Sequence, residues 1–440
     1  MSSVVIHAHC YQPPREDPFT GLVPVEPTAA PFHDWNARIT DESYLPLASA
    51  RDLGARARVN LFEWISFNIG PTLASWLDHE APAVLEAMRT GDARSVARLG
   101  HGNAIASSYN HVILPLASHH ERKREIEWGL QDFRTRFGRD ARGFWCPETA
   151  IDDDTAQALA EAGVQFVILA PYQVHHGHDG QPRRWHGANG RSLHLAPYHG
   201  ELSGAIGFGS LAQQGDRLAH TLATVSAERG IASIATDGET FGHHKRHGEM
   251  ALAEAIGILR RTSRAAVTNF DAIIASRSDW TDGALVSPSS WSCSHGVERW
   301  RANCGCGATH ETGRTQEWRG PLREALRWLA DAVDATDGTD PALTPQRKAR
   351  YGMFTSCGWF FDRFEGHEPR LLLRMAAFAM AGRADAEALE AGLVARLVHA
   401  NANDRSLGNG ADIWYRDFHH LLVTPAATPA AVFPGAPLTA

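Results

Sequence analysis

The spacing of hydrophobic and polar residues differs between two regions of the chain. Up to about residue 285, short apolar runs alternate with helix-length amphipathic segments, as is typical of β/α units around a parallel sheet. The apolar runs predict strands over residues 4–9, 59–64, 105–109, 164–170 and 231–236. Helical spacing predicts outer helices over residues 122–137, 154–162 and 249–261. The expected fold class of this region is α/β, a β/α barrel.

The second region begins after Pro321 and has only the helical period. Four successive segments predict helices without intervening strands, at residues 322–333, 347–364, 369–382 and 386–402. The expected organisation is a catalytic barrel over 1–285, a Trp/Cys-rich loop segment over 286–315, a helical C-terminal domain over 316–423 and a flexible tail over 424–440.

Composition narrows the classes of partner. The 440 residues are 43% hydrophobic and 21% charged, which fits a globular protein with a sizeable core. A formal charge of −8 argues against nucleic acid or an anionic membrane as a partner and suits a neutral substrate. Neither a secretory signal nor a long apolar run is evident, so a cytoplasmic location is expected. The oligomeric state is not predicted.

Reactive groups in a β/α barrel lie at the C-terminal ends of the strands. His7 and His9 alternate on the first strand and therefore share one face. Such a pair could bind sugar hydroxyls, hold a metal or simply be satisfied by backbone carbonyls. Glu148 follows an apolar run with Trp145 and Pro147, and tryptophan suits the stacking of a sugar ring. The alternative is a glutamate that only solvates a loop.

The densest group of polar residues spans positions 234–244. There an apolar strand runs into Asp237, Glu239, His243 and His244, and a period of two places both carboxylates on one face. Neighbouring carboxylates raise one another's pKa and need compensating donors, unless the segment is merely a hydrated turn. Two carboxylates converging in a barrel mouth are what glycosidic cleavage needs, and Glu148 and Asp237 are the candidate pair.

Six cysteines scattered through a chain of this size favour free thiols over a disulfide framework. Cys293, His295, Cys304 and Cys306 could bind structural zinc, but their spacing is not that of a familiar zinc finger. We interpret them as free thiols that stabilise a loop, and neither a catalytic metal nor a cofactor is expected.

At these motifs the sequence resembles glycoside hydrolase family 57. The family's opening histidine-x-histidine and Gln-Pro element is similar to His7–His9 with Gln12–Pro13, and its Tyr-x-His-x-Ile-Leu-Pro element is similar to residues 109–115. Its third and fourth elements are similar to residues 145–148 and 237–239. Residues 291–306 and 355–362 resemble a subgroup with an uncharacterised, DUF3536-like helical C-terminal region.

The resemblance implies an incomplete seven-stranded β/α barrel that cleaves or transfers α-glucan chains, as α-amylases and 4-α-glucanotransferases do. It implies retention of anomeric configuration, with Glu148 as nucleophile, Asp237 as general acid/base and the two carboxyl groups about 5–5.5 Å apart. The positions that it suggests for substrate binding are His7, His9, Tyr109, Trp145, Glu239, His243, His244 and Trp291.

Two alternatives to this interpretation remain open from the sequence. A metal-dependent carbohydrate hydrolase or deacetylase would use a ligand set drawn from His7, His9, Asp237, His243 and His295. A non-catalytic glucan-binding protein would keep the barrel and lack turnover. Amylase, transferase and branching activities share the same carboxylate pair, so the sequence does not separate them.

Overall fold

The computed structural model describes residues 2–308, 315–338 and 344–423. The chain divides into two compact units. The first consists of Met1–Pro14, Val25–Tyr109 and Ile126–Ser287, and the second of Arg15–Pro24, Asn110–Glu125 and Pro288–Ala440. The expected flexible tail, 424–440, lies outside the described residues, as do residues 309–314 of the loop segment.

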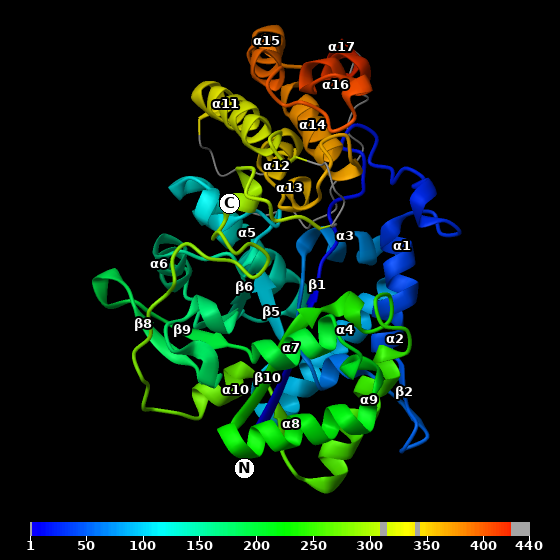
Figure 1. Ribbon diagram of the computed structural model, residues 1–440, viewed down its shortest axis with the longest axis vertical. Coiled ribbons are helices and arrows are strands. Elements are labelled where there is room, and N and C mark those ends of the chain that lie inside the picture. The colour runs from blue at the N-terminus through cyan, green and yellow to red at the C-terminus, as the bar shows by residue number, and fades with distance from the viewer. Residues whose placement is uncertain (1, 309–314, 339–343, 424–440) are drawn as a thin grey trace. The chain divides into compact units, whose positions relative to one another are not determined.

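The first unit is built on seven parallel strands in the order β10-β1-β4-β5-β6-β7-β9 (Figure 1). Their bounds are β1 Ser3–Cys10, β4 Ser66–Ile69, β5 Ala104–Ser107, β6 Gly143–Trp145, β7 Phe166–Leu169, β9 Ser192–Pro197 and β10 Ile231–Asp237. β8 (Arg183–His186) runs antiparallel to β9, and β11 (Ala266–Thr268) pairs with the start of β1. β1 is buried from its second residue to its last, as expected for a strand covered on both faces.

β9 and β10 are the two ends of the parallel array, and the residues after β9 join them. The backbone N–H of His199 donates to the carbonyl oxygen of Ser233 at 2.8 Å, and the backbone N–H of Ser233 donates to His199 Nδ1 at 3.2 Å. Ser233 Oγ donates to the carbonyl oxygen of Pro197 at 3.3 Å. In a closed barrel the first and last strands pair along their length, whereas here these few hydrogen bonds join β9 to β10. The expected incomplete seven-stranded barrel is therefore confirmed.

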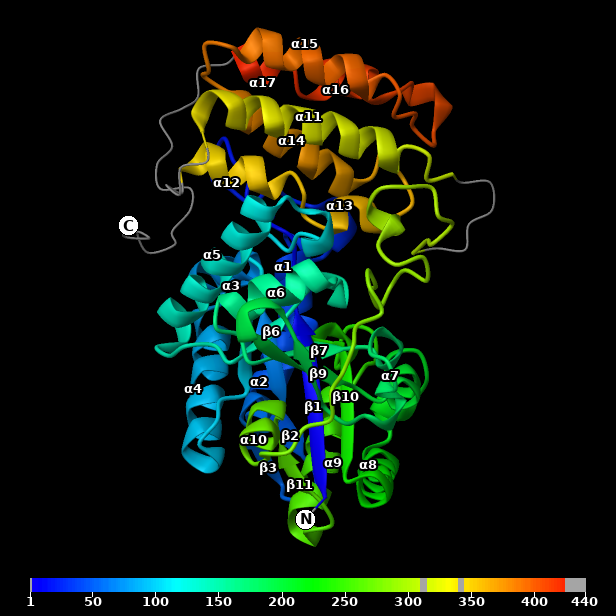
Figure 2. The ribbon, with the colours of Figure 1, turned by 90° about the vertical axis from the view of Figure 1, so that its left-hand side faces the viewer.

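Helices cover the strands of this unit, and α8 packs along α9 (Figure 2). The helices are α3 Pro71–Glu80, α4 Pro82–Leu99, α5 His119–Phe137, α6 Asp153–Glu161, α7 Gly200–Gly207, α8 Gly215–Arg229, α9 Gly248–Thr262 and α10 Phe270–Ala275. The three predicted outer helices correspond to α5, α6 and α9, although α5 begins three residues early and its part up to Glu125 belongs to the second unit.

The predicted strand over residues 59–64 is wrong, whereas the other four predicted strands are confirmed as β1, β5, β7 and β10. Residues Ala57–Val59 form β3, which pairs with β2 (Ala50–Asp52) in a separate two-stranded sheet. Asn60 then starts a 3₁₀ turn by accepting the N–H of Phe62 at 3.1 Å. Leu61 and Phe62 are buried by that turn, and the barrel strand follows as β4.

A widened helical turn lies between α1 (Trp35–Ile39) and α2 (Leu45–Ala48). Residues Thr40–Tyr44 form one π-helical turn within this otherwise α-helical stretch. Such turns are rare and often occur at functional sites, because the extra residue re-aims the neighbouring side chains. This turn supplies three side chains to the site described below.

The second unit is helical, with α11 packed against α15 and α12 against α14. Its helices are α11 Arg319–Asp337, α12 Pro345–Gly352, α13 Cys357–Phe360, α14 His367–Met380, α15 Ala386–Leu397, α16 Gly410–Asp417 and α17 His420–Val423 (Figure 2). The single helix predicted over 347–364 is wrong: the backbone N–H of Ser356 donates to the carbonyl oxygen of His111 instead of continuing a helix. No helix in the described parts of the chain has the length and apolar character that crossing a membrane requires.

Candidate active site

His7, His9 and Trp145 form an imidazole–indole stack. The rings of His7 and His9 both lie nearly parallel to the ring of Trp145, each with a centroid distance of 4.9 Å. The prediction that the two histidines share a face is therefore confirmed. Trp145 is fully buried, and in this structure its ring supports the two imidazoles.

Two residues of the neighbouring strand fix the histidines. In the register of β1 with β4, His7 pairs with Ser66 and His9 with Asn68. Asn68 Oδ1 lies 3.2 Å from His7 Nε2 and 3.1 Å from His9 Nδ1, and Ser66 Oγ lies 3.0 Å from His7 Nδ1. Burial, with a smaller effect of His9, lowers the pKa of His7 to about 3, and burial lowers the pKa of His9 to about 4. Both imidazoles are therefore neutral at neutral pH.

Glu148 lies in a strained turn directly after β6. Its backbone is in the left-handed region, with φ 59° and ψ 22°, and Thr149 follows with φ 48°. Such conformations cost non-glycine residues about 1–3 kcal/mol each and persist where the surroundings fix them. Gln173 does so here: it accepts from Thr149 Oγ1 and donates to the carbonyl oxygen of Thr149, both at 2.8 Å. The buried amide of Gln173 thus fixes the backbone of Thr149, the residue after half-buried Glu148.

Asp237 is the last residue of β10, and its carboxyl group is in an environment that favours the protonated form. Burial raises the pKa of Asp237 well above its usual range, and the charges of Glu239 and Glu148 raise it further. The charge of Glu148 acts on Asp237 although β1, β4 and β5 separate their strands in the sheet. An acid that keeps its proton beside a second carboxylate is the pairing that general acid catalysis uses.

Glu239 lies beyond the strand, so the period-two argument does not apply to it. β10 ends at Asp237, and Gly238–Thr240 is a 3₁₀ turn. The proximity of the two carboxylates comes from that turn. Burial raises the pKa of Glu239, while hydrogen bonds from Tyr44 and Gln12 oppose the rise.

The π-helical turn anchors Glu239. The hydroxyl of Tyr44 donates to Glu239 Oε1, Gln12 Nε2 donates to the same oxygen at 3.2 Å, and Ser43 Oγ donates to the carbonyl oxygen of Glu239 at 3.4 Å. Sequence reasoning missed Tyr44, Ser43 and Asn68. Their position follows from the π turn and from the pairing of β1 with β4, neither of which a hydrophobic pattern reveals.

Replacing Tyr44 by phenylalanine should destabilise the first unit. The change removes one donor from a buried carboxylate, which costs about 1–3 kcal/mol when the group is left less satisfied. The free energy of unfolding measured by urea titration gives the difference. Tyr172→Phe, at a position 47% exposed, is the matched control. Equal stability of both variants would contradict the role given to Tyr44.

His243 and His244 follow the same turn and contact the π-helical segment. His243 Nδ1 hydrogen-bonds the carboxylate of Glu42, and the backbone N–H of His243 donates to Ser43 Oγ at 2.9 Å. The rings of His243 and His244 lie 4.9 Å apart, and burial followed by the charges of His243 and Lys245 lowers the pKa of His244. The predicted cluster of carboxylates and histidines is therefore one connected group.

Gly242 permits this approach. Its φ is +144°, and a Cβ at this position would lie 1.9 Å from the carbonyl oxygen of Glu42. We expect Gly242→Ala to lower the melting temperature and the free energy of unfolding by more than the roughly 1–2 kcal/mol of a left-handed alanine alone. Gly190→Ala is the control, because Gly190 also has a positive φ but has no atom within 4 Å of an added Cβ. Equal losses in the two variants would show that the close approach is unimportant.

The remaining predicted residues occupy different places. Tyr109 lies two residues beyond β5, half-buried, with its ring edge-on to Trp128 at 6.0 Å. Trp291 belongs to the second unit. A further residue, Tyr198, senses the charge of Asp237. The pKa of Tyr198 is raised by burial, then by Tyr172 and then by Asp237.

The metal-dependent interpretation requires side-chain donor atoms that lie close enough together to bind one ion. Within residues 2–308, 315–338 and 344–423, one set of three or more His, Cys, Asp or Glu side chains is arranged closely enough to share an ion, and it consists of Cys293, His295, Cys304 and Cys306. His295 is thus grouped with cysteines of the second unit. The barrel residues of the alternative ligand set do not form such a group.

The fold and the site define a class: incomplete parallel β/α barrels that carry a pair of carboxylates at their strand ends. The family described as glycosyl hydrolase family 57 matches residues 33–273, more than half of the chain, and the protein belongs to this family. Residues 343–430 match a domain of unknown function, DUF3536. Both resemblances noted in the sequence are confirmed.

Similar proteins share the fold over much of the chain and the sequence over a shorter part. The chain is 25% identical to a 4-α-glucanotransferase of Thermococcus litoralis over 132 residues, 30% of this chain and 18% of that protein. It is 23% identical to an α-amylase of Pyrococcus abyssi over 108 residues, 24% of this chain and 16% of that protein. The matches thus span less than a fifth of either relative.

Among solved structures, the Thermococcus litoralis 4-α-glucanotransferase superposes with a TM-score of 0.63 at 16% identity, covering 86% of this chain and 59% of that one. A family 57 branching enzyme from Thermococcus kodakaraensis superposes with a TM-score of 0.60 at 15% identity, covering 97% of each chain. At these identities the likeness concerns the fold.

Proposed function

We propose that the protein cleaves or transfers α-glucan chains with retention of anomeric configuration, with Glu148 as nucleophile and Asp237 as general acid/base. The observation that carries the proposal is the place of Asp237 at the end of β10, where burial, then the charge of Glu239 and then that of half-buried Glu148, raises the pKa of Asp237. Members of the matched family named as glucanotransferase and α-amylase support α-glucan as the substrate class.

The proposed reaction has two steps. In the first, Glu148 attacks the anomeric carbon while Asp237 gives its proton to the glycosidic oxygen, so that the C–O bond breaks and a covalent glycosyl-enzyme forms. In the second, ionised Asp237 takes a proton from water or from a sugar hydroxyl, which attacks the anomeric carbon and releases Glu148. Water gives hydrolysis, and a sugar hydroxyl gives transfer.

The surroundings of the pair suit this chemistry. His7 and His9 are neutral and buried, so they place no positive charge in the barrel that would lower the pKa of the acid. Glu239 keeps two donors of its own and lies beside Asp237, so its charge helps Asp237 retain its proton. The strained turn fixes the direction of Glu148 before substrate binds.

Product analysis tests the proposal. The purified protein is incubated with maltoheptaose and with soluble starch, with and without a chelator, and the products are separated by size. We expect shorter chains, or a mixture of shorter and longer chains if transfer dominates, whether or not chelator is present. No change in either α-glucan would overturn the proposal, as would activity that disappears on chelation while circular dichroism shows the fold unchanged.

A further inference from the structure

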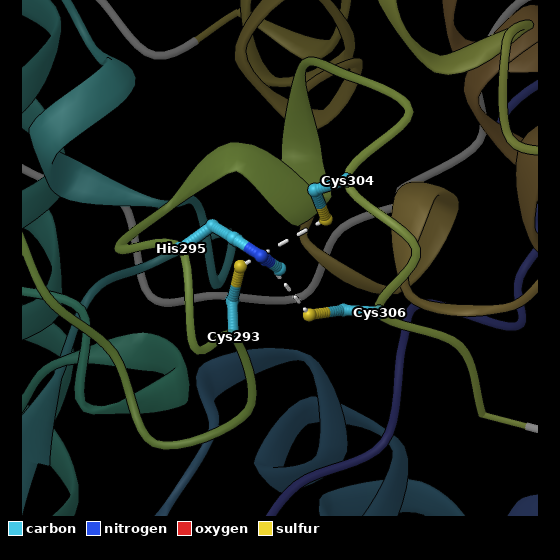
Figure 3. A group of neighbouring side chains, drawn as sticks. All are labelled: Cys293, His295, Cys304 and Cys306. Atoms are coloured by element: carbon cyan, nitrogen blue, oxygen red, sulfur yellow. Dashed lines mark hydrogen bonds between the residues drawn. The ribbon is translucent and has the colours of Figure 1, made fainter.

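The second unit contains four potential metal ligands that the proposed reaction does not use. Donor atoms of Cys293, His295, Cys304 and Cys306 all lie within 4.8 Å of one another. Figure 3 shows the three sulfur atoms and the imidazole directed toward a common space, although the residues come from two stretches of one loop. All four residues lie in the Trp/Cys-rich segment, which is outside residues 33–273, the part of the chain that matches family 57.

Two of the distances between the donors are close to those around one tetrahedral ion. Two sulfurs bound to tetrahedral zinc at about 2.3 Å lie about 3.8 Å apart, and a bound sulfur and nitrogen lie about 3.6 Å apart. Here Cys293 Sγ and Cys304 Sγ are 4.0 Å apart, and Cys306 Sγ and His295 Nδ1 are 3.5 Å apart. A disulfide between Cys293 and Cys304 would need an S–S distance of about 2.05 Å.

Backbone hydrogen bonds reach two of the three sulfurs. Backbone groups of His295 and Arg299 hydrogen-bond the sulfur of Cys293, and the backbone of Ser294 hydrogen-bonds that of Cys306. Gly305, with φ +82°, turns the chain between Cys304 and Cys306 so that both side chains reach the same space. Donors to sulfur fix the ligands and stabilise thiolate charge.

Buried charge around the group also fits a metal-bound form. Arg299 donates to the carbonyl oxygen of Ser292 at 2.8 Å, and Arg319 to that of Cys306 at 3.0 Å. These arginines are 3% and 0% exposed, and Asp362, 3.7 Å from Arg319, offers one negative charge against their two positive charges. A zinc ion with three thiolates and a neutral imidazole has a net charge of −1. This charge balances the second arginine.

We propose that Cys293, His295, Cys304 and Cys306 bind one zinc ion that ties the loop segment together within the second unit. Three thiolates with one imidazole in a tetrahedron is a ligand set that selects zinc. Four protein ligands leave no open position, so the ion is structural and takes no part in glucan chemistry. Binding releases the three thiol protons to solvent.

Metal analysis of the full chain tests the site. The protein is expressed with zinc in the medium, purified with a reductant, desalted and analysed by plasma mass spectrometry. We expect close to one zinc per chain, and about 0.1 or less in Cys304→Ser and in Cys306→Ser. Cys357→Ser, which removes a cysteine of the same unit outside the group, should keep its zinc.

A spectroscopic measurement covers the case in which the cluster variants do not fold. After exchange of the wild-type metal for Co²⁺, thiolate-to-cobalt charge-transfer absorption with the visible bands of a tetrahedral ion is expected. Zinc near zero with all six thiols titratable in the unfolded protein would overturn the proposal. Two thiols missing until reductant is added, which indicates a disulfide, or zinc retained in both cluster variants would overturn it as well.

Discussion

Glu148→Gln should lower kcat on maltoheptaose by on the order of 10³-fold or more, because the amide cannot form the glycosyl-enzyme on which the proposed route depends. The fold should remain intact. The side chain is half-buried, and the substitution preserves its shape while removing a negative charge from beside Asp237. Initial rates of product formation measure the change.

Glu228→Gln, at an exposed position on α8 in the same unit, is the matched control and should keep wild-type activity. The fold should survive the Glu148→Gln substitution, because hydrogen bonds between Gln173 and Thr149 fix the backbone of this turn. A Glu148→Gln variant that retains more than about a tenth of wild-type kcat would rule out Glu148 as the nucleophile.

Asp237→Asn should abolish the alkaline limb of the pH profile and lower kcat by about 10²–10⁴-fold on natural glucans. The wild-type enzyme needs Asp237 protonated for the first step, and burial with the charges of Glu239 and Glu148 raises its pKa. Activity should therefore persist toward neutral pH and fall as the pH rises through the pKa of Asp237. With an activated aryl glycoside the loss should be smaller, because such a leaving group needs little protonation. An unchanged alkaline limb in the variant would assign the proton to another group.

The effect of Asp237→Asn on the free energy of unfolding shows whether lost activity reflects lost chemistry or lost fold. The pKa of Asp237 in the folded protein lies above its unfolded value of about 3.9, so the free energy of unfolding falls as the pH rises from that value through the folded pKa. Asparagine has no charge to bury. Urea unfolding at pH 8 should therefore show the variant at least as stable as the wild type, and a clear loss of stability would mean that inactivity reflects unfolding.

The hydrophobic pattern predicts the barrel because β1, β5, β7 and β10 are buried apolar runs between amphipathic helices. It fails at residues 59–64, where Asn60 caps a short turn and the buried Leu61 and Phe62 imitate a strand. It also fails at the break between α12 and α13, where Ser356 bonds to a segment distant in sequence. Both errors come from hydrogen bonds that periodicity does not encode.

The site was predictable where chemistry follows a strand end and unpredictable where it depends on pairing. Asp237 ends β10 and Glu148 follows shortly after β6, so position along the chain was enough to select both as candidates. Asn68 acts through its register with His9, and Tyr44 acts through a π turn between two short helices. The cysteine group was visible in the sequence, but its interpretation as free thiols lacked the distances that now support a zinc site.

Trapping the covalent intermediate tests the central claim most directly. The protein is incubated with a fluorinated α-glucosyl or α-maltosyl fluoride, which forms a glycosyl-enzyme rapidly and releases it slowly, and the digested chain is analysed by mass spectrometry. The two-carboxylate account predicts one sugar adduct, on the peptide that contains Glu148, and none in Glu148→Gln. Substrate turnover without an adduct, or an adduct on another residue, would contradict it.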